Sequence, residues 1–162
     1  MERRKTIILV IAFVSLLCTA AVRAQATKPA QMTALNLLRA REPKVTWKAS
    51  SLLKADFDYD GVDDYALGGE AGSRYFVGVV KGPISTHSKH WTMGFSADPG
   101  DQASLCSVST AQITLEPLDD ERVEGASKLP PNGSGINLSD GACDSFHIYW
   151  DRKTKRFVWW RL

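Results

Sequence analysis

Beyond Pro43, short stretches rich in Val, Ile, Phe, Tyr and Trp alternate with clusters of Gly, Pro, Asp, Asn and Ser, and this alternation restricts the chain to a mainly β fold. A short helix is predicted before them, at residues 31–42, because Ala34, Leu35 and Leu38 share one helical side. We expect a small antiparallel sheet or sandwich-like domain with this one N-terminal helix. Strands are predicted at residues 46–55, 65–68, 74–81, 90–96, 104–109, 112–115, 146–150 and 156–161.

Two segments give more detail about the sheet. Residues 74–80 are apolar on both faces, which predicts a strand in the middle of a sheet. Residues 145–151 and 156–161 are joined by a polar four-residue link, which predicts a hairpin. Its tryptophans, Trp150, Trp159 and Trp160, are expected to pack in the core or on a sheet face, and a carbohydrate-stacking surface is the alternative. Residues 97–103 and 121–139 are predicted loops, since they are polar and rich in Pro and Gly.

The N-terminus has the order of a cleavable signal peptide. A mostly basic start precedes an apolar run at residues 6–21, and small residues follow around Ala24. A membrane anchor needs about 20 apolar residues, so this run is short for one. Acylation at Cys18 needs a small residue before it, whereas Leu17 stands there. We therefore predict cleavage after Ala24, a flexible lead-in at residues 25–30, and a single domain at residues 31–162 that is periplasmic or secreted.

Cleavage changes the charge and the cysteine count. It removes four of the 20 basic and one of the 18 acidic residues, so the mature chain has no basic excess to bind nucleic acid or an anionic membrane. Cys18 leaves with the signal, and Cys106 and Cys143 remain. Two cysteines in an oxidising compartment usually pair, and a redox-active pair normally has closer spacing. A structural disulfide between Cys106 and Cys143 is predicted.

An acidic loop at residues 56–64 carries the most specific chemistry. Its sequence, DFDYDGVDD, places aspartates at positions 1, 3, 5 and 9 and a glycine at position 6, where a sharp bend is needed. Ca²⁺ takes six to eight oxygens at about 2.3–2.6 Å, and such a loop can wrap around it. Mg²⁺ fits less well, because it prefers rigid octahedral sites. The predicted calcium ligands are Asp56, Asp58, Asp60, Asp64 and the backbone carbonyl of Val62.

The loop is not an EF-hand. An EF-hand needs a bidentate Glu at position 12 and a helix on each side. Here position 12 is Leu67, and the residues after the loop indicate a strand. Asp63 is expected to face solvent. The alternative interpretation is an acidic turn that never holds metal, although four close aspartates repel one another without a cation.

Residues 54–68, KADFDYDGVDDYALG, resemble one FG-GAP/VCBS-type repeat, the calcium-loop hairpin of integrin-like propellers and many secreted bacterial proteins. The resemblance implies Ca²⁺ held between two strands of a sheet, and it covers roughly residues 52–80. A propeller repeats this unit four to eight times, whereas this chain has one copy. The resemblance therefore implies no closed propeller and no propeller partner surface.

Other candidate residues give weaker signals. Asp140 and Asp144 flank Cys143 and could act as paired carboxylates near His147, as in glycosidases, but turn formers beside a disulfide are the simpler interpretation. His87 and His90 lack a third zinc ligand nearby. We expect no enzyme, but an exported, non-catalytic, calcium-stabilised β module that binds a protein or glycan partner. The alternative is a secreted hydrolase of envelope or extracellular polymers with its site near Asp140 and Asp144.

Overall fold

The computed structural model describes residues 29–118 and 133–161. The chain divides into two units, Met1–Met32 and Thr33–Leu162, and all strands belong to the second. The predicted signal peptide lies outside the described residues. A helix spans residues 29–41, close to the predicted 31–42, so residues 29 and 30 are helical rather than part of a flexible lead-in.

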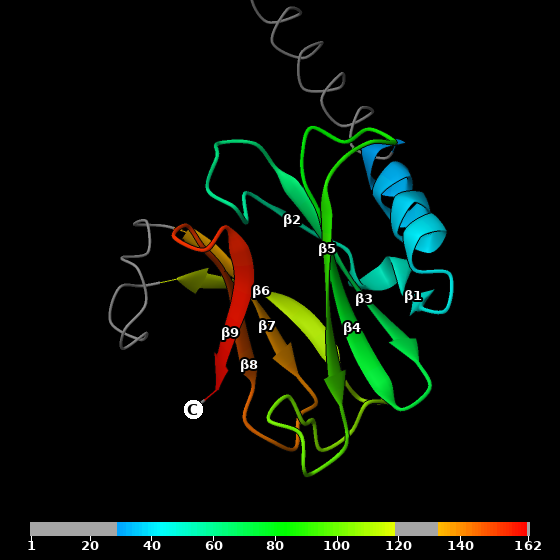
Figure 1. Ribbon diagram of the computed structural model, residues 1–162, viewed down its shortest axis with the longest axis vertical. Helices are drawn as coiled ribbons and strands as arrows, with labels where there is room; N and C mark the ends of the chain where they lie inside the picture. The colour runs from blue at the N-terminus through cyan, green and yellow to red at the C-terminus, as the bar shows by residue number, and fades with distance from the viewer. Residues whose placement is uncertain (1–28, 119–132, 162) are drawn as a thin grey trace, which may run out of the picture. The chain divides into compact units, whose positions relative to one another are not determined.

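The fold is mainly β, as predicted, with two antiparallel sheets (Figure 1). In the first sheet the strand order is β1-β3-β4-β5, and β2 also pairs with β3. In the second sheet, β6 to β9 lie in sequence order. A short 3-10 helix, Ala49–Ser51, separates β1 from β2. The strands are β1 Thr46–Trp47, β2 Leu53–Ala55, β3 Asp64–Ala71, β4 Arg74–Val80, β5 His90–Ser96, β6 Gln112–Leu118, β7 Gly133–Ser139, β8 Phe146–Asp151 and β9 Arg156–Arg161.

The two sheets share one hydrophobic core. Aromatic rings from both sheets meet there: Trp91 of β5 lies 5.0 Å from Trp150 of β8, and Phe95 of β5 lies 4.9 Å from Phe146 of β8, measured between ring centroids. Such tilted and edge-on aromatic pairs add to the free energy gained from apolar burial. The predicted hairpin of residues 145–151 and 156–161 is confirmed as β8 and β9, and its Trp150 packs in this core.

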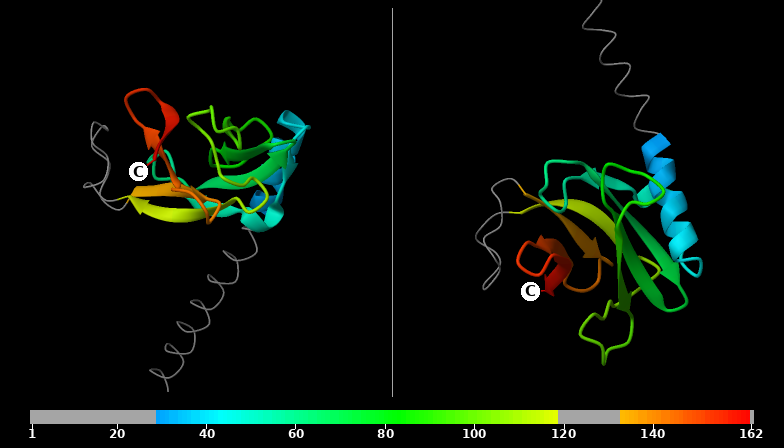
Figure 2. Two further views of the ribbon diagram at one scale, coloured as in Figure 1. Left: turned by 90° about the horizontal axis from the view of Figure 1, so that it is seen from below. Right: turned by 45° about the horizontal axis from the view of Figure 1, so that its top comes forward.

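The prediction that residues 74–80 form a central strand is also confirmed. β4 pairs with β3 on one side and with β5 on the other. Its Val77 and Val79 face the core shared with the second sheet. A Cβ on Gly78 would lie 2.6 Å from the Trp47 ring and 2.9 Å from Leu38 of the helix, so the helix packs directly on the other face. In Figure 1 and Figure 2 the helix and strands β6–β9 lie on opposite sides of β3–β5.

Two strand predictions were wrong because side chains satisfy the backbone there. The predicted strand at 46–55 is interrupted by the 3-10 helix, where the Ser51 hydroxyl donates to the Lys48 carbonyl and accepts from the Gly68 N–H. Residues 104–109 form no strand beyond an isolated bridge at Ser104. Elsewhere the strands are longer than predicted at 65–68 and 112–115; β6 continues through Pro117, which an edge strand tolerates.

Strand β7 lies where a loop was predicted. Residues 121–132 of that predicted loop lie outside the described residues, but residues 133–139 pair with both β6 and β8. The sequence did not predict this strand because it contains glycines, and glycine is uncommon in strands. Gly135 has a packing reason: a Cβ there would lie 2.8 Å from Leu118 and 2.9 Å from the Ile148 carbonyl oxygen. The alternation of buried Ile136 and Leu138 was the signal for β7.

The predicted disulfide between Cys106 and Cys143 is confirmed. It joins the segment before β6 to the turn between β7 and β8, at a sequence separation of 37 residues. On the chain-entropy model, closing a loop of this length stabilises the fold by about 4 kcal/mol. The bond also indicates folding in an oxidising compartment.

We predict that replacing both cysteines by alanine lowers the free energy of unfolding by about 4 kcal/mol, because the unfolded chain regains the entropy of that loop. Urea unfolding of the variant and of the wild type measures the difference. Two titratable thiols in unreduced, exported protein would contradict the assignment of this bond.

Candidate metal site

The acidic loop connects β2 to β3, and the residues at its two ends pair with each other in the β2–β3 ladder. Ala55 lies opposite Asp64 in the antiparallel register, so residues 56–63 form the connection of a hairpin. Phe57 anchors the loop in the core between the sheets, with only 1% of its surface exposed. Tyr59 and Gly61 both have positive φ angles, 60° and 88°, and the loop bends sharply at these two residues.

Asp64 is fully buried and is held by backbone donors. The N–H groups of Phe57 and Asp58 donate to its Oδ2 (3.1 and 3.2 Å), and the N–H of Gly82 donates to its Oδ1 (2.8 Å). The pKa of Asp64 is raised to about 6: burial raises it most, the neighbouring charge of Asp58 adds to the rise, and the N–H donors oppose it. The negative charge of this carboxylate is therefore incompletely compensated.

Asp56 and Asp60 shape the exposed part of the loop. Asp56 accepts hydrogen bonds from the N–H of Asp60 (3.0 Å) and from the N–H of Gly61 (2.7 Å), one on each oxygen. Asp60 accepts one from the N–H of Val62 (2.9 Å). These contacts fix the turn, and each carboxylate oxygen keeps a second lone pair for another partner.

Three of the predicted metal ligands come together. Carboxylate oxygens of Asp56, Asp58 and Asp64 all lie within 4.8 Å of one another. Two oxygens bound to one Ca²⁺ lie at most about 5 Å apart, so this spacing fits the ion. Oδ1 of Asp58 is buried and has no hydrogen-bond partner in the part of the chain that the structure describes. A buried anionic oxygen without a donor is the atom that a cation would satisfy.

The remaining loop residues take different places. Asp60 is not part of the three-carboxylate cluster. The side chain of Val62 is exposed. Asp63 is 55% exposed, as predicted, and pairs with Lys54 at 2.6 Å.

Sequence reasoning missed Lys81, which reaches into the loop. Its ammonium group pairs with Oδ2 of Asp58 and with Oδ2 of Asp60. Partial burial would lower the pKa of Lys81, but the two carboxylates outweigh it and raise the pKa. The signal was the β3–β4 hairpin. Its antiparallel register pairs Tyr65 with Val80, so Asp64, the residue before Tyr65, and Lys81, the residue after Val80, lie at the same end of the hairpin.

Asp140 supports the disulfide. Its Oδ2 accepts from the N–H groups of Cys106 (2.6 Å) and Ser107 (2.9 Å), and its Oδ1 accepts from those of Ala142 and Cys143 (both 2.9 Å). Burial alone would raise the pKa of Asp140, but the four donors outweigh it and hold the pKa below its usual value of 3.8. The turn-former interpretation describes this residue better than a paired catalytic carboxylate.

The other candidate residues are not part of the three-carboxylate cluster. Asp144 is exposed. His147 of β8 is buried, with Nδ1 2.7 Å from Oε1 of Glu116, and its ring stacks on Trp160 at 4.0 Å. Neither His87 nor His90 belongs to a group of metal-ligating side chains among the described residues.

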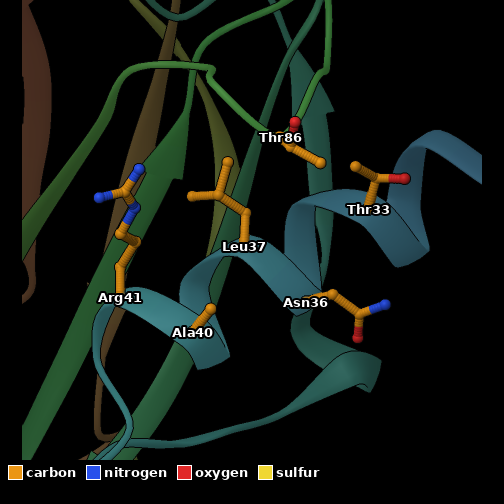
Figure 3. Close-up of a pocket in the computed structure, with 6 residues that line it drawn as sticks. All are labelled: Thr33, Asn36, Leu37, Ala40, Arg41 and Thr86. Carbon is orange, nitrogen blue, oxygen red and sulfur yellow. The ribbon is translucent and has the colours of Figure 1, made fainter.

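A pocket of about 550 Å³ lies between the helix and the loop after β4 (Figure 3). Leu37 and Ala40 supply its apolar part, and Arg41 supplies a positive charge. Threonine and asparagine side chains complete the lining: Thr33, Asn36 and Thr86.

No family model, curated protein or solved structure matches the chain. Within residues 29–118 and 133–161, no helix has the length and hydrophobicity that crossing a membrane takes.

We predict that Asp140→Asn lowers the free energy of unfolding by about 3 kcal/mol at neutral pH, because an amide offers one acceptor oxygen where four N–H groups need two. The depressed folded-state pKa means that Asp140 stabilises the fold above pH 3.8, and that this contribution disappears as the pH falls through the folded-state value. The variant should therefore lose less stability than the wild type between pH 4 and about pH 2.

Denaturant melts across this pH range test the prediction. Asp144→Asn is the matched control, since that exposed carboxylate lies four residues away. Equal stability of the Asp140 and Asp144 variants would show that the four hydrogen bonds do not support the fold.

Proposed function

We propose that this protein is an exported, non-catalytic β module whose acidic loop binds one Ca²⁺, and that the module binds an extracellular or envelope partner. The observation that carries the metal proposal is the cluster of three carboxylates within 4.8 Å, one of which has a buried oxygen without a donor. Asp56, Asp58 and Asp64 would hold the ion. Asp60 and the Val62 carbonyl would join them by a small movement of the exposed turn.

The ion would stabilise structure rather than supply chemistry. The loop is tied to the core through Phe57, so metal binding would hold β2, β3 and the inter-sheet core in register. With no acid at position 12, affinity should be weak, roughly 10⁻⁴ M as in extracellular modules. The resemblance to FG-GAP/VCBS-type repeats supports this proposal, since it also places a calcium loop between two antiparallel strands.

Two features support export. The predicted signal peptide would direct the chain out of the cytoplasm. The Cys106–Cys143 disulfide requires an oxidising environment to persist, as in the periplasm or outside the cell. Calcium is also abundant enough outside the cell to fill a weak site.

The partner proposal rests on the pocket beside the helix. Its mixture of apolar wall, hydroxyl groups and the Arg41 guanidinium suits a polar protein segment or a glycan. None of the five tryptophans is exposed, so a flat stacking platform for sugar rings is not favoured. Exposed large hydrophobic side chains in the described chain are scattered over the helix, the acidic loop and β6: Met32, Val62 and Leu115.

We predict that millimolar Ca²⁺ raises the melting temperature by about 5 °C relative to chelator. With free calcium at ten times the dissociation constant, mass action adds about 1.4 kcal/mol to the stability of the folded state. Asp58→Ala should abolish the rise, because it removes the orphaned oxygen from the cluster. Asp63→Ala is the control from the same loop and should keep the rise, since its side chain faces solvent.

Thermal melts and titration calorimetry measure both effects. Superimposed melting curves with and without calcium, together with no heat of binding, would show that the loop is an acidic turn without a metal.

For the binding role, we predict that the immobilised protein retains a specific component of an envelope extract, and that Arg41→Ala reduces the retained amount at least tenfold. Arg39→Ala, a change of equal charge on the same helix outside the pocket, should retain it fully. Equal retention by both variants would remove the pocket from the proposal.

A further inference from the structure

Lys81 occupies the place beside the acidic loop where a cation is needed. It follows β4 directly, and its backbone is fixed because its N–H donates to the Lys89 carbonyl (2.9 Å). The next residue, Gly82, donates to Asp64, so the end of β4 is tied to the loop whether or not the lysine side chain stays there. The Lys81 side chain is therefore free to leave without breaking these backbone contacts.

Asp58 is shared between Lys81 and the three-carboxylate cluster. Its side chain is 6% exposed, and Oδ2 pairs with the Lys81 ammonium while Oδ1 has no donor among the described residues. A divalent ion bound to the cluster would therefore lie next to the ammonium on the same carboxylate. Two cations in such positions repel each other in a partly desolvated site. The divalent ion and the Lys81 ammonium group therefore compete for Asp58.

We propose that Lys81 is a tethered counter-ion that Ca²⁺ must displace, so that calcium binding exchanges the lysine ammonium for the metal at Asp58 and Asp60. This inference rests on the proposed calcium site and assigns the residue that sets its affinity. The lysine neutralises part of the loop's charge without metal and keeps the loop folded. A monovalent ion gains too little from the carboxylates to expel an ammonium group, so the exchange favours divalent cations.

The structure leaves a route for the displaced ammonium group. The Lys81 side chain is 28% exposed and reaches Asp60, which lies on the exposed turn. A rotation of its flexible stem moves the charge into water at low cost, while the backbone contacts of Lys81 and Gly82 stay in place. Calcium binding by this exchange needs no rearrangement of the sheet.

Lys81→Met tests the exchange, because it keeps the apolar stem and removes the charge. In calorimetry with Ca²⁺ alone, the variant should bind the ion at least about tenfold more tightly than the wild type. The reason is that Ca²⁺ need not break a charge-assisted hydrogen bond from Lys81 in order to bind the variant. In chelator the variant should melt at a lower temperature than the wild type. Lys54→Met is the matched control: Lys54 pairs with Asp63 outside the cluster, so its loss should leave calcium affinity unchanged.

A second measurement uses the unaltered chain, so it does not depend on the variant folding. Amine-reactive labelling followed by mass spectrometry reports the accessibility of each lysine. Calcium should increase the labelling of Lys81 severalfold and leave that of Lys54 unchanged. Unchanged labelling of Lys81 in protein that binds calcium would overturn the exchange.

The outcomes separate the two proposals. Calcium binding of equal strength in the wild type and Lys81→Met would overturn the exchange and leave the calcium site standing. Binding by the variant alone would support the exchange, with Lys81 as a complete block. If neither protein binds calcium, both the site and the exchange are wrong.

Discussion

A carboxylate buried away from water needs donors, and Asp64 takes its three from two separate parts of the chain. Two come from its own loop and one from Gly82, at the far end of the β3–β4 hairpin. This single side chain therefore closes the β2–β3 connection and attaches it to the end of β4. The approach is close enough that a Cβ on Gly82 would lie 2.1 Å from the Asp63 carbonyl oxygen. The attachment also positions Asp58, because the Asp58 N–H is one of the three donors.

Asp140 is a second buried carboxylate that ties two segments together, next to the other sheet. The different surroundings of Asp140 and Asp64 explain the difference between the two sites. Four backbone donors saturate Asp140, and its pKa lies below the usual value. Asp64 has three donors, and burial, together with the negative charge of Asp58 beside it, raises its pKa to about 6. The four N–H donors thus compensate the negative charge of Asp140, whereas the negative charges of Asp64 and Asp58 need a nearby positive charge. That need, rather than the number of aspartates, distinguishes a candidate metal site from a structural turn.

The sequence predicted the parts of this arrangement that depend on local patterns, but not those that depend on contacts between distant residues. The mainly β fold, the central position of residues 74–80, the final hairpin and the disulfide follow from local periodicity and pairing rules. Strand β7 was missed because Gly135 is required by the approach of Leu118 and Ile148, which only the folded sheet brings about. Lys81 was missed for a similar reason, since its contacts join residues more than 20 positions apart. Residues 56–64 reveal the anionic half of the site, and the folded hairpin supplies its cation.

The acidic loop also touches the second sheet. Tyr59, at the tip of the bend, packs against the cluster formed by Leu118 of β6 and Tyr149 of β8, and the Arg152 guanidinium lies 5.2 Å from its ring. Partial burial raises the pKa of Tyr59 to about 12. A loop held by Asp64 on the first sheet and by Tyr59 on the second links the two layers at one edge. Asp58, which pairs with Lys81, directly precedes Tyr59, so the charged part of the loop adjoins its contact with the second sheet.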